Sequence, residues 1–558
     1  MNQTCRLVLL RVAPFVWEAA VICLVAALIA APCLASEALP ADGATDAGAA
    51  IYRTGMLPSG HPLEATREGG ARVSGAEAAC SNCHRRSGLG AREGRILIPP
   101  VTGKYLFTPP AGYGDLPYVE GVRANREPYT EETAARAIRD GIGPDGRPLS
   151  YLMPRFILGD SDMKSLIGYL RTLDRPAQAG ATDTVLHFAT VITPDADPVK
   201  RQGMLAVLKQ FFTDKNAFPL GPTPRLKASR KEMFMVNRLW QLHVWQLSGP
   251  ADTWGDQLKK HYAREPVLAV LSGLGGKNWA PVHAFCERQH VPCLFPNVDA
   301  PPDGADHDFY SLYFSRGVTL EAGLIANKIL DAGNGDMPKR VQQIYRAGDI
   351  GAAGASALAA ALQARGVKVQ TVVLPEGKPG RGLAKALHGA ASADALVMWL
   401  RPQDIASLGK MPASPRAVFM SGLMGGLERA PLPQSWRART RLAYPFALQE
   451  ERRVNVDFAF GWFAIRHVPL VAEQVQADTF LACSLLAETL HHMADTFVPD
   501  YLVERFEDMT DQRLITGYYP RLTLAPGQRF ASKGGYIVHF SGLAGPLLAA
   551  DGGWVIPR

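Results

Sequence analysis

The chain has 558 residues, of which 47% are hydrophobic and 20% are charged. This is the usage of ordinary globular proteins, and the length is too great for one compact core, so disordered, fibrous and small single-domain proteins are excluded. The net charge of +7 is spread along the chain without a Lys/Arg run or a basic stripe with aromatic residues, which excludes nucleic acid as a partner.

Residues 1–35 have the pattern of a secretory signal peptide. Arg6 and Arg11 precede an apolar run over residues 19–34, and small residues follow it up to Ser36. The run is shorter than the roughly 20 residues that a membrane span needs, so we expect cleavage before Ser36 and a mature protein in the periplasm. If cleavage does not occur, the same segment would anchor the protein to the membrane.

The next motif is Cys-Ser-Asn-Cys-His, from Cys80 through Cys83 to His84. Cys-x-x-Cys-His is the attachment signature of c-type haem, in which two thiols bind the vinyl groups of the porphyrin and the histidine binds the iron. A redox dithiol or half of a zinc site also contains Cys-x-x-Cys, but the two further ligands that zinc needs are not found nearby in the sequence. The export signal favours haem, and the motif occurs once.

A methionine on a proline-stiffened loop is the candidate for the sixth iron ligand. Met153 precedes Pro154, and an amphipathic helix is predicted to start at Asp160 or Ser161 and to end before Pro176. Met163 lies on the apolar face of that helix and is interpreted as a core residue.

With this order of motifs, residues 44–175 resemble a monohaem cytochrome c, which implies an all-α domain. The resemblance implies that Cys80 and Cys83 bind haem covalently, that His84 is the proximal ligand and that Met153 is the distal ligand. His61 is the alternative distal ligand. A histidine–methionine pair closes the iron and suits one-electron transfer with a periplasmic redox partner.

Residues 176–183 are rich in Pro, Gly and Ala and are predicted to be a linker. From residue 184 onwards, strands alternate with helices, which predicts parallel sheets covered by helices. Predicted strands cover residues 185–192, 266–273, 291–295, 340–346, 367–374 and 395–400. Predicted helices cover residues 198–215, 280–290, 352–365, 383–390 and 477–490, and residues 526–558 are expected to form short strands.

Two segments of this region resemble a known family. The strand that begins at Val341 leads into Tyr-Arg-x-x-Asp-x-Gly at 345–351 and then a helix, and Tyr-Phe-Ser-Arg at 313–316 precedes a long helix. Both segments are similar to the lobe-crossing and second-lobe regions of type I periplasmic solute-binding proteins, receptors for branched-chain amino acids and amides that serve ABC importers. The resemblance implies a two-lobed α/β module over residues 184–558 with a small-molecule ligand between the lobes.

If that resemblance holds, loops at the carboxyl ends of the strands would bind the ligand. The candidate residues are Ser272, Gly273, Tyr313, Arg316 and Asp349. Ser272 and backbone amides would hold a carboxylate together with Arg316, and Asp349 would hold an ammonium group. A structural role is open for each of them, for example a helix N-cap at Asp349.

The remaining cysteines and tryptophans are interpreted structurally. Cys286 and Cys293 form a disulfide or remain buried thiols, since the sequence does not fix their geometry. Cys483, in an apolar helical run, is interpreted as a buried thiol. Trp240, Trp245, Trp254 and Trp279 are expected in the core.

The sequence therefore predicts an exported c-type haem protein for one-electron transfer, joined to a module that binds an amino-acid- or amide-like solute. The alternative is the haem-containing, electron-accepting subunit of a periplasmic oxidoreductase whose large domain handles the substrate. In the first case the partners are a redox protein and an ABC importer, and in the second a periplasmic dehydrogenase. A third interpretation is a large domain that only mediates protein contacts.

Overall fold

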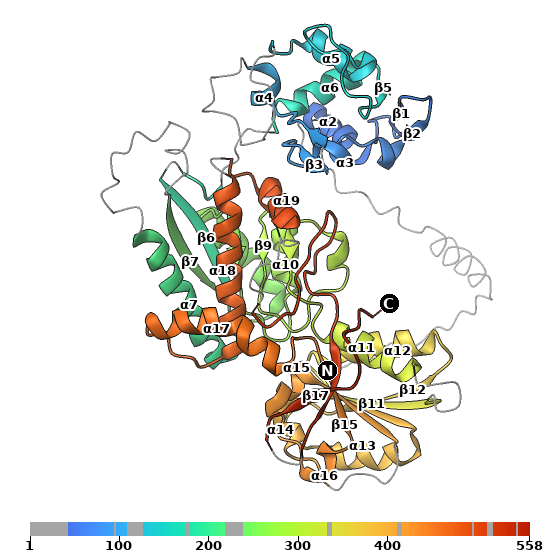
Figure 1. The fold of residues 1–558 in the computed structure, drawn as a ribbon, viewed down its shortest axis with the longest axis vertical. Coiled ribbons are helices and arrows are strands. Elements are labelled where there is room, and N and C mark those ends of the chain that lie inside the picture. The colour runs from blue at the N-terminus through green and yellow to red at the C-terminus, as the bar shows by residue number, and fades with distance from the viewer. Residues whose placement is uncertain are drawn as a thin grey trace, which may run out of the picture.

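The computed structural model describes residues 43–93, 96–108, 127–173, 179–182, 184–217, 238–331, 338–409, 416–493, 496–509, 517–542 and 545–557. The predicted signal peptide and part of the predicted linker lie outside these residues. Figure 1 shows a small N-terminal module beside two larger α/β lobes. No helix within the described ranges is long and apolar enough to cross a membrane.

The N-terminal module is built mainly from helices. In chain order its elements are α2 (Gly43–Thr54), β1 (Glu64–Thr66), β2 (Arg72–Ser74), α3 (Ser81–His84), β3 (Ala91–Glu93), β4 (Ile96–Ile98), α4 (Gly103–Phe107), α5 (Glu131–Asp140), β5 (Arg155–Ile157) and α6 (Asp160–Leu170). The predicted amphipathic helix is present as α6, and its apolar face packs into a core that includes Met163, Leu166 and Leu170. Met163 is 3% exposed, which confirms it as a core residue.

Helices α2 and α6 are in close contact. A Cβ atom on Gly48 of α2 would lie 2.2 Å from the carbonyl oxygen of Ser165 and 2.6 Å from the Cβ of Tyr169, both on α6. Tyr52, one turn further along α2, packs its ring 5.5 Å from the ring of Tyr169. Glycine at position 48 therefore sets how near the two helices come.

The expectation of an all-α module needs a correction. Three short strands pair antiparallel in the order β2-β1-β5, and β3 pairs with β4. Each of these strands has three residues, which is too short for an alternating apolar pattern to stand out in the sequence.

The first lobe contains a five-stranded parallel sheet in the order β10-β9-β8-β6-β7. Its elements are β6 (Val185–Ile192), α7 (Pro198–Ala217), β7 (Leu239–Gln246), α9 (Trp254–Arg264), β8 (Ala269–Leu271), α10 (Ala280–Gln289), β9 (Cys293–Leu294) and β10 (Ser311–Leu312). Strand β7 was not predicted, because its polar residues interrupt the apolar run. The four tryptophans named above are all buried, as expected for core residues.

The second lobe contains a seven-stranded sheet in the order β12-β11-β13-β14-β15-β16-β17, parallel up to β15 and antiparallel after it. Its elements are α11 (Val318–Leu330), β11 (Arg340–Arg346), α12 (Gly351–Gln363), β12 (Lys368–Leu374), α13 (Leu383–Gly389), β13 (Ala395–Trp399), α14 (Pro402–Ile405), β14 (Ala417–Ser421), α15 (Gly422–Gly425), α16 (Gln434–Arg437), β15 (Thr440–Tyr444), β16 (Tyr536–Phe540) and β17 (Leu548–Ala550). The predicted two-lobed α/β module is confirmed by these two sheets.

The chain passes between the lobes three times. It leaves the first sheet after β10 for α11, returns after β15 to α17 (Gln449–Ile465), α18 (Glu473–Met493) and α19 (Pro499–Met509), and crosses again into β16. Helix α18 packs against α7, which places these late helices on the first lobe (Figure 1). Two crossings are hydrogen-bonded to each other, because Tyr313 N donates to Arg529 O at 2.8 Å and Ala531 N donates to Tyr313 O at 3.0 Å.

The N-terminal module docks on α19 through the residues that follow His84. The side chain of Arg85 pairs with Glu507 at 2.5 Å, and Arg86 pairs with Asp500 at 2.7 Å. Ser87 donates to Glu504 from its backbone N at 2.9 Å and from its hydroxyl at 2.5 Å. Leu89 completes the contact by packing into the hydrophobic core of the large module.

We expect Gly48→Ala to destabilise the N-terminal module by about 1–3 kcal/mol, because the new methyl group must force α2 away from α6. Gly168→Ala on α6 is the matched control, since a Cβ there meets nothing within 4 Å. This control should be neutral or stabilising by up to about 1 kcal/mol. Urea unfolding of the full-length variants measures both changes, and equal effects at the two positions would contradict the close approach.

Candidate functional site

A pocket that is open to solvent lies between the two lobes. Its lining comes from loops at the carboxyl ends of β8, β9 and β10 in the first sheet and of β14 and β15 in the second. The starts of α7 and α18 and the segment around Tyr519 complete it. In open α/β sheets, this edge is where connecting loops converge and ligands bind.

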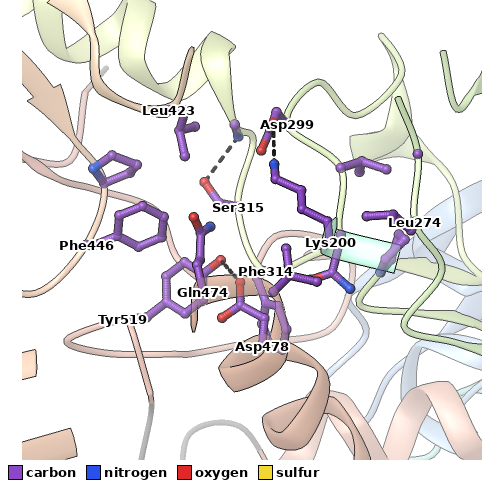
Figure 2. Close-up of a pocket in the computed structure, with 17 residues that line it drawn as sticks. Lys200, Leu274, Asp299, Phe314, Ser315, Leu423, Phe446, Gln474, Asp478 and Tyr519 are labelled. Atoms are coloured by element: carbon purple, nitrogen blue, oxygen red, sulfur yellow. Dashed lines mark hydrogen bonds and ion pairs between the residues drawn. The ribbon is translucent and has the colours of Figure 1, made fainter. Parts of the chain in front are cut away.

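One wall of the pocket is aromatic. The ring of Tyr519 lies 5.3 Å from that of Phe314 and 5.4 Å from that of Phe446. Phe314 comes from the first lobe, and Phe446 follows β15 of the second lobe, so the wall joins the two lobes (Figure 2).

A buried carboxyl group lies beside this wall. Asp478, in the first half of α18, is 4% exposed and accepts a hydrogen bond from the hydroxyl of Tyr519 to Oδ2 at 3.4 Å. The dashed line at Asp478 in Figure 2 marks this bond, and Gln474, one turn earlier, also lines the pocket. Oδ1 of Asp478 is buried without a hydrogen-bond partner among the described residues. Burial raises the pKa of Asp478 to about 8, so the group is protonated at neutral pH.

An ion pair lies at another side of the pocket. Lys200, near the start of α7, has its ammonium group 3.8 Å from a carboxylate oxygen of Asp299, which follows β9 (Figure 2). The backbone carbonyl of Asp299 accepts a hydrogen bond from Val318 N at 2.8 Å. Gly317 has a φ of +58°, and a Cβ there would lie 1.9 Å from that same carbonyl oxygen, so only glycine allows this crossing so close to the pocket.

None of the five predicted ligand residues is part of the described pocket lining. Ser272 is buried and donates to Thr479 Oγ1 at 2.9 Å, and Gly273 packs against a tryptophan ring. Tyr313 is buried, and Arg316 pairs with an aspartate outside the pocket. Asp349 accepts two hydrogen bonds from a guanidinium group and one from the first residue after it.

Sequence neighbours of the first four do line the pocket, namely Leu274, Gly275, Phe314, Ser315 and Gly317, whereas no neighbour of Asp349 does. The sequence analysis missed the contributions of α7, α18 and Tyr519 altogether. One signal was available for α18, because an aspartate inside a long apolar helical run is unusual for a buried helix.

The Cys-x-x-Cys-His segment forms a compact turn in the N-terminal module. Cys80 is the N-cap of α3, and Cys83 and His84 are its last two residues. His84 Nδ1 lies 2.9 Å from the carbonyl oxygen of Pro99, so Nδ1 carries the proton and Nε2 keeps its lone pair. Burial lowers the pKa of His84 and raises that of Cys80 to about 12. Met153 is half-buried and packs, like Cys80, against the core of this module.

Other thiols lie in the large module. Cys286 and Cys293 are both free and fully buried, on α10 and β9, and their side chains are hydrogen-bonded to each other. Burial raises the pKa of Cys286 well above its usual value. Cys483 is a buried free thiol, as the sequence predicts. In the described part of the chain, no group of three or more His, Cys, Asp or Glu residues is placed to hold a metal ion.

No protein-family model matches the sequence, and no curated protein matches it. Solved structures do resemble it. A substrate-binding periplasmic protein from Ralstonia solanacearum is 13% identical with a TM-score of 0.49, over 65% of this chain and 99% of that chain. A branched-chain amino acid ABC transporter periplasmic ligand-binding protein from Burkholderia xenovorans is 14% identical with a TM-score of 0.49, over 66% and 95% of the two chains.

A branched-chain amino acid ABC transporter protein from Thermus thermophilus, with bound valine, is 11% identical with a TM-score of 0.46, over 67% of this chain and 97% of that chain. The two-lobed architecture of this chain itself rests on its strand order and its three crossings.

The raised pKa of Asp478 has a consequence for stability. In the unfolded chain an aspartate has a pKa of about 3.9, so between about pH 4 and pH 8 the folded state binds the extra proton and stability falls as pH rises. We expect Asp478→Asn to remove this part of the slope, which is at most about 1.4 kcal/mol per pH unit for one group. Urea unfolding at pH 5 and pH 8 measures the slope.

The control is Asp457→Asn, an exposed carboxylate on α17. It should leave the pH dependence as it is in the natural protein. An identical slope in Asp478→Asn and the natural protein would mean that Asp478 is ionised in the folded state.

Proposed function

We propose that residues 184–557 form a solute-binding module whose ligand occupies the pocket between the lobes. The observation that carries this proposal is the position of the pocket, at the carboxyl ends of both sheets and beside two crossings of the chain. A ligand there contacts both lobes at once and stabilises one arrangement of them over others.

The pocket lining favours a small ligand with an apolar part and an amino or amide group. The aromatic wall would cover the apolar part. Asp478 Oδ1 is buried without a partner among the described residues, which is costly, and a polar group of the ligand, such as an amide, would satisfy it. The ammonium group of Lys200, which also lines the pocket, would form an ion pair with a carboxylate of the ligand. This chemistry supports an amino-acid- or amide-like solute.

We also propose that the N-terminal module carries one covalently attached haem c, with His84 as proximal and Met153 as distal ligand. The short turn bearing Cys80 and Cys83 and the fixed tautomer of His84 are what such a group requires. When bound, the haem supplies reversible one-electron transfer.

The chain's own residues would shape that site. Pro99 holds the imidazole of His84 in orientation through its carbonyl group. The side chain of Arg155 donates to the carbonyl oxygen of Met153 at 2.5 Å, which restrains the loop that carries the thioether. In this proposal the protein works in the periplasm, where a redox protein exchanges electrons with it and an ABC importer receives the solute.

We expect the protein, exported in a host that attaches haem c, to show one covalent haem by pyridine haemochrome assay and haem staining. Cys80→Ser together with Cys83→Ser should abolish covalent attachment. Met153→Ala should remove the weak far-red absorption band of methionine-ligated ferric haem. Met163→Leu, which changes a core methionine, is the matched control and should keep that band.

A covalent haem whose far-red band survives Met153→Ala would assign the distal ligand to another residue. A natural protein without haem would refute the electron-transfer proposal. Absorbance beyond the haem bands would instead favour an oxidoreductase subunit with a second cofactor.

We expect some members of a panel of L-amino acids and their amides to raise the melting temperature in a concentration-dependent way. Asp478→Asn should weaken binding about tenfold, or about 1.4 kcal/mol, since the asparagine cannot offer the same carboxyl group to the ligand. Isothermal titration measures the affinity, with Asp457→Asn as control. Binding that is equally strong in both variants would place the ligand away from Asp478.

A further inference from the structure

The residue directly after His84 has an unusual backbone conformation. Arg85 has φ 64° and ψ 168°, a region that is occupied almost only by glycine. A side chain persists there only when its surroundings hold it in place, and such strain occurs preferentially at functional sites. The strain in Arg85 lies one peptide bond away from the histidine of the Cys-x-x-Cys-His motif.

Arg85 is held from two sides. Within its own module, the hydroxyl of Tyr52 donates a hydrogen bond to the carbonyl oxygen of Arg85 at 2.7 Å. From the large module, the carboxylate of Glu507 on α19 pairs with its guanidinium at 2.5 Å. The side chains of Arg85 and Glu507 are 11% and 2% exposed, so solvent screens this pair little.

Glu507 in turn is bound to a crossing between the lobes. Its other carboxylate oxygen accepts a hydrogen bond from the guanidinium of Arg529, whose side chain is 1% exposed. The carbonyl oxygen of Arg529 accepts from Tyr313 N at 2.8 Å, on the crossing that leads to Phe314 and the pocket. A continuous set of contacts thus runs from the pocket wall to the residue after His84.

We propose that Arg85 is a positioning residue, through which the large module holds the proximal histidine and thereby tunes the reduction potential of the haem. The proposal rests on the proposed haem c. Glu507 keeps Arg85 in its strained conformation, and Arg85 in turn fixes the backbone next to His84. Because Glu507 is also bound to Arg529 in a crossing between the lobes, a change in the arrangement of the lobes would change the orientation of the His84 side chain. The other docking contacts, at Arg86 and Ser87, involve residues without positive φ and hold the modules together independently.

The test is spectroelectrochemical titration of the full-length haem protein in two variants, Arg85→Gln and Glu507→Gln. A pure through-space charge effect predicts shifts of opposite sign, because one variant removes a cation and the other an anion near the haem. Positioning predicts shifts of the same sign, because both variants release residue 85. We expect each to change the ratio of reduced to oxidised haem about three- to tenfold at fixed potential, where tenfold corresponds to about 59 mV for one electron.

Arg85→Lys, which can keep the pair with Glu507, should restore most of the natural potential. Arg86→Gln is the matched control: it removes a neighbouring cation from the same interface while leaving residue 85 restrained, and it should shift the potential less than Arg85→Gln does. Tyr52→Phe releases the carbonyl of Arg85 from within the N-terminal module and should shift the potential in the same direction. It keeps the proposal testable if an interface variant fails to fold.

Opposite shifts in Arg85→Gln and Glu507→Gln, or an unchanged potential in both, would overturn the proposal while the haem assignment stands. A natural protein that carries no covalent haem would instead refute the proposed function on which this inference rests.

Discussion

Glu507 accepts hydrogen bonds from two guanidinium groups, one in the N-terminal module and one in the last crossing between the lobes. All three side chains are nearly excluded from solvent, and removing one partner from such a buried pair typically costs about 3–5 kcal/mol. Departure of the N-terminal module would take Arg85 away and expose the hydrophobic side chain of Leu89. The charge network therefore sets where the small module sits on the large one.

The acidic face of α19 explains why the N-terminal module docks there. Helix α19 presents Asp500, Glu504 and Glu507, three to four residues apart, on one face of the helix. Arg85 meets this face at Glu507, Arg86 at Asp500 and Ser87 at Glu504. A salt-bridged interface of this kind specifies orientation, because each buried carboxylate would be left unpaired in any other arrangement. Burial raises the pKa of Glu504 to about 8, and its two hydrogen bonds from Ser87 offset part of that cost.

Much of this architecture could be predicted from local sequence patterns. The Cys-x-x-Cys-His motif, helix α6 and strands such as β13, whose five residues are all buried, are each encoded within a few neighbouring residues. Strand β7 could not be predicted in this way, since its alternate residues face different surroundings and include a histidine and two glutamines. The three-residue strands of the N-terminal module are likewise products of tertiary pairing.

The full lining of the pocket could not be predicted from the sequence. Strand ends in the first lobe indicated the right loops, since residues one or two positions away from Gly273, Tyr313 and Arg316 line the pocket, but the loop of Asp349 does not contribute to it. Asp478 and Tyr519, in contrast, come from segments after the second crossing, and only long-range packing brings them to loops some 200 residues earlier. The α19 interface has the same origin, because Glu507 and Arg85 are separated by 422 residues.

The segments that cross between the lobes contact both the pocket and the interface between α19 and the N-terminal module. Phe314 and Ser315 line the pocket, and Ser532 N donates to the carbonyl oxygen of Phe314 at 2.6 Å. Three residues earlier in that partner segment is Arg529, which binds Glu507. Two lobes joined by crossing segments move relative to each other through small backbone rotations in those segments. Residues 313–314 and 529–532 are hydrogen-bonded side by side. In the proposed function, a rotation that closed the lobes around a solute would therefore act on the residues that hold Arg529, and through Glu507 on the segment after His84.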